Sequence, residues 1–112
     1  MNTNQKISFL LADYAVRIIA ARHFPELAKL EPIRSVKTAD TAYYTANAAY
    51  AAANAARYAA NAATHADAAA YADTAAAAAY AAYYAANYTT SVMYANDIRA
   101  LINIAIDPDR YW

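Results

Sequence analysis

Histidine, serine and acidic side chains are the residues of this 112-residue sequence that could carry out catalysis or bind a metal. His23 and His65 have no His, Cys or carboxylate four residues further on, whereas a zinc site needs three or four converging ligands. Ser8, Ser35 and Ser91 have no recognisable nucleophile context, and a chain without Gly has no phosphate-cradling loop. We therefore predict a non-enzymatic protein with no catalytic residue, no metal site and no cofactor.

Tyrosine is the side chain whose chemistry favours binding instead. The sequence has 12 tyrosines, and the Tyr ring is large, rather rigid and amphipathic, as interface residues often are. One group of tyrosines covers a wide arc of a helix that is otherwise mostly Ala, with an acidic neighbour. The predicted partner-binding residues are Tyr80, Tyr83, Tyr84, Tyr88 and Asp73. The alternative is that these rings fill the gaps that Ala leaves in the core.

The tract that carries these tyrosines predicts the fold class. Between Ala39 and Ala86, 28 of the 48 residues are Ala and eight are Tyr. Ala has the highest helix propensity, and the chain has no Gly for the turns that a strand-rich domain requires. We predict an all-α protein, a small Ala/Tyr-rich helical bundle of about four helices, which forms a single domain over residues 1–112.

The first helix is predicted from about Thr3 to Arg22, and it is apolar on two sides. One face holds Ile7, Leu10, Leu11, Tyr14 and Ile18, and the roughly opposite strip holds Phe9, Val16 and Ile19. Such a helix is either sandwiched in the core or used in an oligomer. We favour the sandwiched position, and a homo-oligomer stays open.

The segment between Pro32 and Pro108 must contain breaks. A short helical piece is expected at Phe24–Leu30, and Pro32 suits the first turn of the next helix. The 75 residues that follow would form a rod of roughly 110 Å as one helix, which a domain of this size does not bury.

The side-chain pattern locates the helices within this segment. Ala46–Ala63 is predicted to be a helix with one decorated stripe: Tyr43, Asn47, Tyr50, Asn54, Arg57, Tyr58 and Asn61. The stripe that begins at Tyr80 is rotated by about 100° from it, which predicts a chain reversal within Thr64–Thr74. A final helix is expected at Ser91–Ile106, stopped by Asp107-Pro108. Its apolar face is predicted to hold Tyr94, Ile98, Leu101, Ile102 and Ala105.

Charge and composition limit the partners and the location. Nine basic side chains balance nine acidic ones, and a neutral chain lacks the surplus that nucleic-acid binding needs. Residues 1–37 carry six basic and three acidic side chains, whereas residues 38–112 carry three and six, so this acidic part could meet a basic partner. We predict no nucleic-acid partner and no membrane span. The absence of Cys and of a convincing signal peptide suits a cytoplasmic protein.

The layout of the chain resembles a known family. An aromatic-rich first helix, a Pro-marked junction and a long Ala-rich tract dotted with Tyr, Asn, His and Asp occur in order over about residues 10–86. The stretches concerned are LLADYAVRIIAARHFPE and PIRSVKTADTAYYTANAAYAAANAARYAANAATHADAAAYADTAAAAAYAAYYAA. They resemble the Ala-rich immunity proteins of bacterial polymorphic toxin systems, the fifth class of predicted immunity proteins. The resemblance implies a helical protein that neutralises a cognate toxin by direct binding.

Two functions are therefore predicted, and the first is preferred. The chain is expected to bind and inhibit a protein partner, a toxin or effector. The alternative is a small helical oligomer of the phage-encoded type that sequesters a small molecule such as a signalling nucleotide, with Tyr83 against the base and Arg57 on the phosphates. An ice-binding helix is disfavoured because the Thr positions are irregular and Tyr is too bulky. The sequence does not identify the partner.

Overall fold

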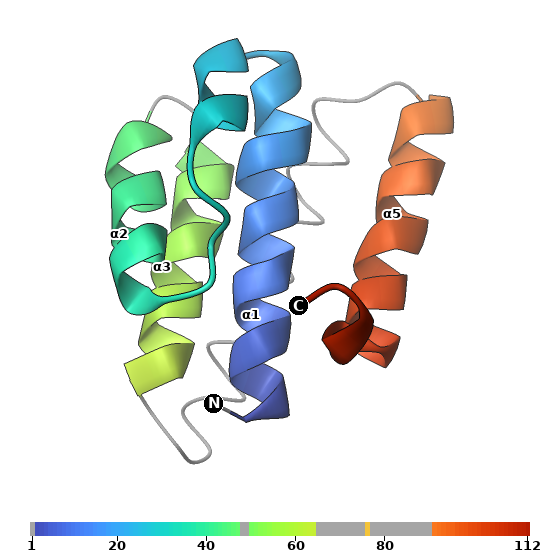
Figure 1. Ribbon diagram of the computed structural model, residues 1–112. Coiled ribbons are helices and arrows are strands. Elements are labelled where there is room, and N and C mark those ends of the chain that lie inside the picture. The colour runs from blue at the N-terminus through green and yellow to red at the C-terminus, as the bar shows by residue number, and fades with distance from the viewer. Residues whose placement is uncertain (1, 48–49, 65–75, 77–90) are drawn as a thin grey trace.

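The protein is an all-α bundle, as predicted. The computed structural model describes residues 2–47, 50–64, 76 and 91–112, and contains no strand among them. Its main helices are α1 (Thr3–Asp13), α2 (Val36–Thr45), α3 (Tyr50–Thr64) and α5 (Ser91–Ile106). Helix α1 is central, with α2 and α3 on one side and α5 on the other (Figure 1).

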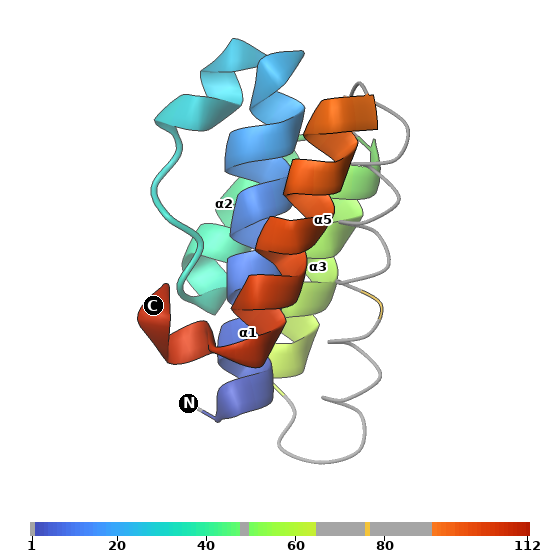
Figure 2. The same ribbon diagram turned by 90° about the vertical axis from the view of Figure 1, so that its right-hand side faces the viewer.

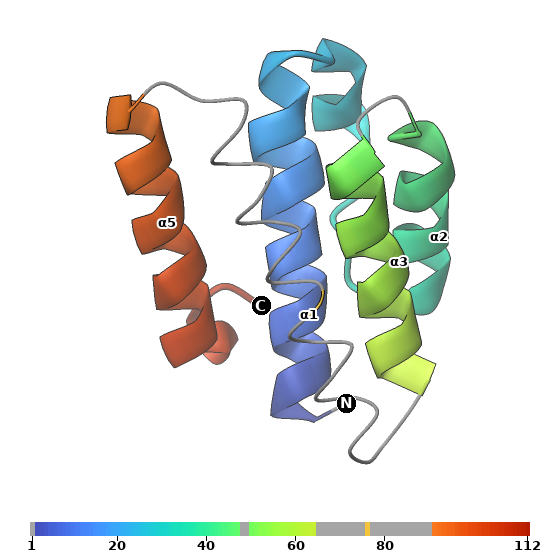
Figure 3. The same cartoon turned by 180° about the vertical axis from the view of Figure 1, so that it is seen from behind.

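The central helix is sandwiched, as its two apolar strips predict. Asn2 caps α1 through a capping box with Gln5, and the chain continues as a π-helical segment (Tyr14–Ile19) and a 3₁₀ turn (Ala20–Arg22). The helical stretch thus covers the predicted Thr3–Arg22. The helical stretch lies between α3 and α5 (Figure 3). Its large buried side chains are Phe9, Leu10, Leu11, Val16 and Ile19. Ile18 departs from the prediction, because 45% of its side chain is exposed.

An extended strap, residues 30–35, separates the first helix from the second. The predicted short piece before it is a 3₁₀ helix at Pro25–Lys29. The strap runs back along α1, and the Ile33 amide donates to Asp13 Oδ1 over 2.9 Å. The prediction that Pro32 lies in the first turn of the next helix is therefore wrong, because α2 begins only at Val36. Pro disfavours the helical conformation of the residue before it, and the helix begins only after its N-cap Ser35, which forms a capping box with Thr38 in the first turn.

A break between α2 and α3 corrects the prediction of a helix through Ala46–Ala63. Helix α2 ends at Thr45, its C-cap Ala46 leaves the helical region, and α3 begins at Tyr50. The hydroxyls of Thr41 and Thr45 donate to carbonyls one turn back, which weakens a helix locally. The two helices then pack side by side and antiparallel (Figures 1 and 3). The predicted reversal within Thr64–Thr74 lies almost wholly outside the described residues.

Alanine forms most of the contact between α3 and its neighbours. The buried small side chains are Ala39, Ala42 and Ala46 before the turn, and Ala52, Ala53, Ala55, Ala56, Ala59 and Ala60 on α3. Because these side chains end at Cβ, they allow the helix axes to approach closely, so that dispersion contacts between backbones and methyl groups take the place of large apolar side chains. Asn54, predicted in the decorated stripe, is buried among them.

Helix α5 has the predicted bounds, but the face that it buries is rotated about the helix axis from the predicted one. Its buried side chains are Asp97, Leu101 and Ile104, whereas Ile102 is 51% exposed and Ala105 is also exposed. The predicted apolar face is thus wrong at Ile102 and Ala105 and confirmed at Leu101 and the partly buried Ile98, whereas the side chain of Tyr94 lies outside the description. The buried carboxylate of Asp97 gives the physical reason below. After α5 the chain turns back towards α1 through a 3₁₀ turn at Pro108–Arg110 (Figure 2).

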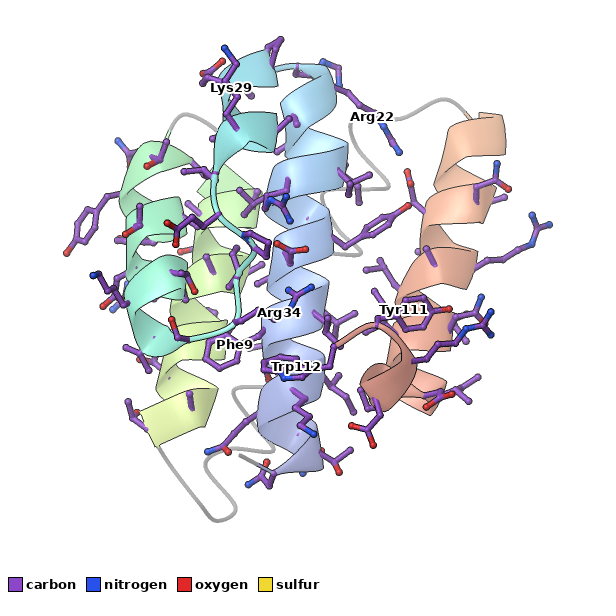
Figure 4. The ribbon with its side chains drawn as sticks, viewed as in Figure 1. Phe9, Arg22, Lys29, Arg34, Tyr111 and Trp112 are labelled. Carbon is purple, nitrogen blue, oxygen red and sulfur yellow. The ribbon has the colours of Figure 1, made fainter. Side chains whose placement is uncertain are left out.

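Two contacts hold the C-terminal turn against α1. Lys6 Nζ forms an ion pair of 3.0 Å with Asp109 Oδ1. The Trp112 ring lies 6.4 Å from the Phe9 ring, between centroids, and the Arg34 guanidinium lies 5.4 Å from the centroid of Trp112. Figure 4 shows Phe9, Arg34 and Trp112 together at the front of α1. The strap and the C-terminal turn thus meet on the same side of the central helix.

Candidate partner-binding surface

The binding residues predicted from sequence lie outside the described part of the chain. They are Tyr80, Tyr83, Tyr84, Tyr88 and Asp73, and their role stays a prediction. The described residues bring tyrosine, arginine and an acid together elsewhere, on the surface formed by α2 and α3.

This surface contains a hollow, here named the α2–α3 groove, of about 330 Å³. Its lining residues come from both helices: Asp40, Tyr43 and Tyr44 from α2, and Arg57, Ala60 and Asn61 from α3. In one continuous helix, Tyr43 and Arg57 would be about 21 Å apart along the axis, at 1.5 Å per residue. The turn between α2 and α3 is what brings them to one groove.

Tyr44 is the most prominent side chain of the groove. It is 76% exposed, although it is a large aromatic residue. Its ring meets the ring of the partly buried Tyr43 edge to face, with centroids 5.0 Å apart and an interplanar angle of 69°. Such pairs contribute about 0.5–1.5 kcal/mol beyond the area that they bury. Tyr43 therefore holds Tyr44 in place while leaving most of its surface to solvent.

The charged groups of the groove are available to a partner. Asp40 and Arg57 are exposed, and within the described residues neither side chain forms an ion pair or a hydrogen bond. Arg57 offers five N–H donors in a planar fork, and Asp40 offers acceptors only. Aromatic anchors next to such groups are typical of the centre of a protein–protein interface.

A second hollow lies on the other flank of α2 and is named the lysine hollow. It measures about 380 Å³ and is lined by Lys29, Leu30, Glu31, Lys37, Thr38 and Thr41. Lys29 stands at the end of the molecule where the strap begins (Figure 4). The two hollows thus share one helix, α2, as their common wall.

A buried polar network joins α1 to α5. Asp97, only 1% exposed, accepts two hydrogen bonds from Arg22, of 2.8 and 2.9 Å, and one of 2.9 Å from Tyr14 Oη. In Figure 4 the Arg22 side chain reaches from the end of the first helix towards α5. This satisfied network explains why α5 turns Asp97, and with it Leu101 and Ile104, towards α1.

The network changes the proton affinity of two of its members. Burial, together with the hydrogen bond to Asp97, raises the pKa of Tyr14 to about 12. The hydrogen bonds to Asp97 raise the pKa of Arg22 above its ordinary value, against the opposing effect of burial. Tyr14 therefore stays protonated and Arg22 charged near neutral pH, so neither acts as a base there.

Sequence reasoning missed both the groove and the network. Asp97, Leu101 and Ile104 have the spacing i, i+4 and i+7 of one helix face, which is the signal that could have placed a carboxylate among apolar residues. For the groove, the available signal was a turn between α2 and α3. Asn47 favours turns, and it follows Thr41 and Thr45, whose hydroxyls can donate to backbone carbonyls one turn back.

The described part of the chain contains neither a cluster of metal ligands nor a membrane-spanning helix. Among residues 2–47, 50–64, 76 and 91–112, no group of three or more His, Cys, Asp or Glu side chains converges as metal ligands do. No helix in these same ranges combines the length and the apolar character needed to cross a bilayer.

Comparison of the chain with protein-family models, with curated proteins and with solved structures found no match.

Proposed function

We propose that this protein is a non-enzymatic inhibitor that binds a protein partner through the α2–α3 groove, in the manner of an immunity protein that neutralises a toxin or effector. The observation that carries the proposal is the 76% exposure of Tyr44, held by Tyr43 beside the exposed Asp40 and Arg57. Truncated interface tyrosines commonly cost about 1–4 kcal/mol of binding free energy. The resemblance to Ala-rich immunity proteins supports the toxin as the class of partner.

The geometry also supports binding over catalysis. The groove holds a guanidinium, a carboxylate and two phenol rings, which are groups of molecular recognition and do not form a nucleophile–base pair. A cytoplasmic location is part of this proposal, because a toxin that acts inside the producing cell has to be neutralised there.

Sequestration of a nucleotide is the second candidate function. The observation in its favour is that Arg57 lies in one groove with Tyr43 and Tyr44, as a phosphate and a base would require. Asp40 in the same groove opposes it, because a carboxylate repels phosphate. A protein partner is compatible with both charges.

The experiment is a growth-rescue assay in which each protein encoded next to the gene of this chain is first expressed alone, and one that arrests growth is taken as the toxin. We expect the wild-type chain to restore growth when it is co-expressed with that toxin, and Tyr44→Ala with Arg57→Ala to fail. Tyr111→Ala serves as the matched control, since it removes another exposed tyrosine far from the groove and should still restore growth.

Three results would contradict the proposal. The first is a wild-type chain that leaves growth unchanged although it accumulates in the cells. The second is a double variant that restores growth as well as the wild type. The third is tight binding of a signalling nucleotide to the purified chain, lost on Arg57→Ala, which would favour sequestration instead.

A further inference from the structure

We infer that the lysine hollow is a second subsite of the same surface and takes an acidic peptide segment of the partner. This inference rests on the proposed function. It starts from the position of α2, which offers Asp40, Tyr43 and Tyr44 to one hollow and Lys37, Thr38 and Thr41 to the other. A partner element that lies along α2 covers both.

The charge of the lysine hollow points to an anionic occupant. Lys29, Glu31 and Lys37 are exposed, and within the described part of the chain none of them has an ion pair or a side-chain hydrogen bond. The hollow therefore has a net charge of one positive unit, from two ammonium groups and one carboxylate. An ammonium is a compact donor that accepts a carboxylate from many directions, which suits a flexible peptide.

The remaining lining residues favour a carboxylate on a carbon chain. Leu30 is partly buried and supplies an apolar wall for the methylene groups of a glutamate side chain. The Thr38 hydroxyl is already bonded to Ser35 and to the Arg34 amide, so it is not free to coordinate a phosphate. Glu31 beside the lysines repels a phosphate dianion more strongly than a single carboxylate.

The two hollows differ in their chemistry, and this difference determines which partners the surface accepts. The α2–α3 groove contributes aromatic contact and one charge of each sign, whereas the lysine hollow selects negative charge. A partner with an acidic segment next to an aromatic-binding patch fits both, and a basic segment is repelled at the lysine hollow. Such charge matching fixes orientation and accelerates association more than it adds affinity.

The test is an amide chemical-shift titration of the full chain with a short acetylated and amidated oligoglutamate peptide. We expect shifts at residues 29–31 and 37–41, and none with oligoglutamine at equal concentration. Lys29→Gln with Lys37→Gln should weaken binding about threefold or more, the range expected for exposed ion pairs. Glu31→Gln should tighten binding, because it removes the competing carboxylate.

The matched control is Arg99→Gln with Arg110→Gln, which removes two positive charges at exposed positions away from α2. This variant should bind the peptide as the wild type does. An equal loss in the control, shifts centred elsewhere, no tightening in Glu31→Gln, or tighter binding of inorganic phosphate than of the peptide would each overturn the inference. Because the titration uses no partner protein, its outcome is separate from that of the growth assay.

Discussion

The carboxylate of Asp97 fixes how α5 faces the rest of the bundle. A buried charge is tolerated only when it is paired and hydrogen-bonded, and here three bonds from Arg22 and Tyr14 satisfy it. If α5 were rotated to bury Ile102 and Ala105, Asp97 would lose these partners. The polar network therefore overrides the more apolar face that a count of hydrophobic residues would select.

Removing this carboxylate should destabilise the protein strongly. We expect Asp97→Ala to lower the free energy of unfolding by about 3 kcal/mol, because Arg22 and Tyr14 lose their acceptor. Asp109→Ala is the control, since it breaks the exposed ion pair with Lys6 and should cost less than about 1 kcal/mol. Urea denaturation of both variants measures the difference, and equal losses would show that the network does not hold α5.

Tyr14 should make stability depend on pH in the alkaline range. Its pKa is raised from 10.0 to about 12, so as the pH rises the unfolded chain loses this proton before the folded chain does. The contribution of Tyr14 is therefore complete below pH 10 and is lost between pH 10 and pH 12, by at most about 1.4 kcal/mol per pH unit.

The comparison with Tyr14→Phe isolates this contribution from other groups that titrate in the same range. Unfolding free energies measured in urea from about pH 8 upwards should show a wild-type advantage that shrinks towards pH 12. An advantage that stays constant over the whole range would mean that Tyr14 keeps its ordinary pKa.

At the scale of the element, helix ends were predictable where the sequence carries an explicit signal. Asp107-Pro108 stops α5 at Ile106, and the bounds Ser91–Ile106 were confirmed. The end of α2 at Thr45 was not predicted, because an Ala-rich sequence favours helix on both sides of the turn and outweighs the weaker local signal of Asn47 and the two threonines.

Close packing of Ala makes α3 intolerant of larger side chains. Ala56 is fully buried, so Ala56→Leu should overpack the contact and lower the free energy of unfolding by about 1–3 kcal/mol. Ala105→Leu introduces the same side chain at an exposed position of α5 and should have little effect. Thermal unfolding of the two variants tests this, and equal melting temperatures would contradict the close approach of the helices.

At the scale of the whole molecule, the all-α class and the sandwiched first helix followed from composition and periodicity. The order of the helices around α1 did not, because a bare Ala face accepts several neighbours equally well. The α2–α3 groove depends on that order, since its residues come from two helices joined by an unpredicted turn. The tyrosines selected from sequence, Tyr80 and its neighbours, were chosen for the interface chemistry of Tyr and for the wide arc that they cover on one helix, and they stay a prediction.

The central claim is that the exposed tyrosine of the α2–α3 groove binds the partner and does not stabilise the fold. Isothermal titration calorimetry with the purified toxin, paired with a thermal melt, measures both properties for Tyr44→Ala. We predict a binding loss of about 1–4 kcal/mol, roughly a fivefold to 1,000-fold weaker affinity, with the melting temperature nearly unchanged. Tyr111→Ala should leave the affinity unchanged. Unaltered affinity in Tyr44→Ala, or a large fall in its melting temperature, would contradict the account.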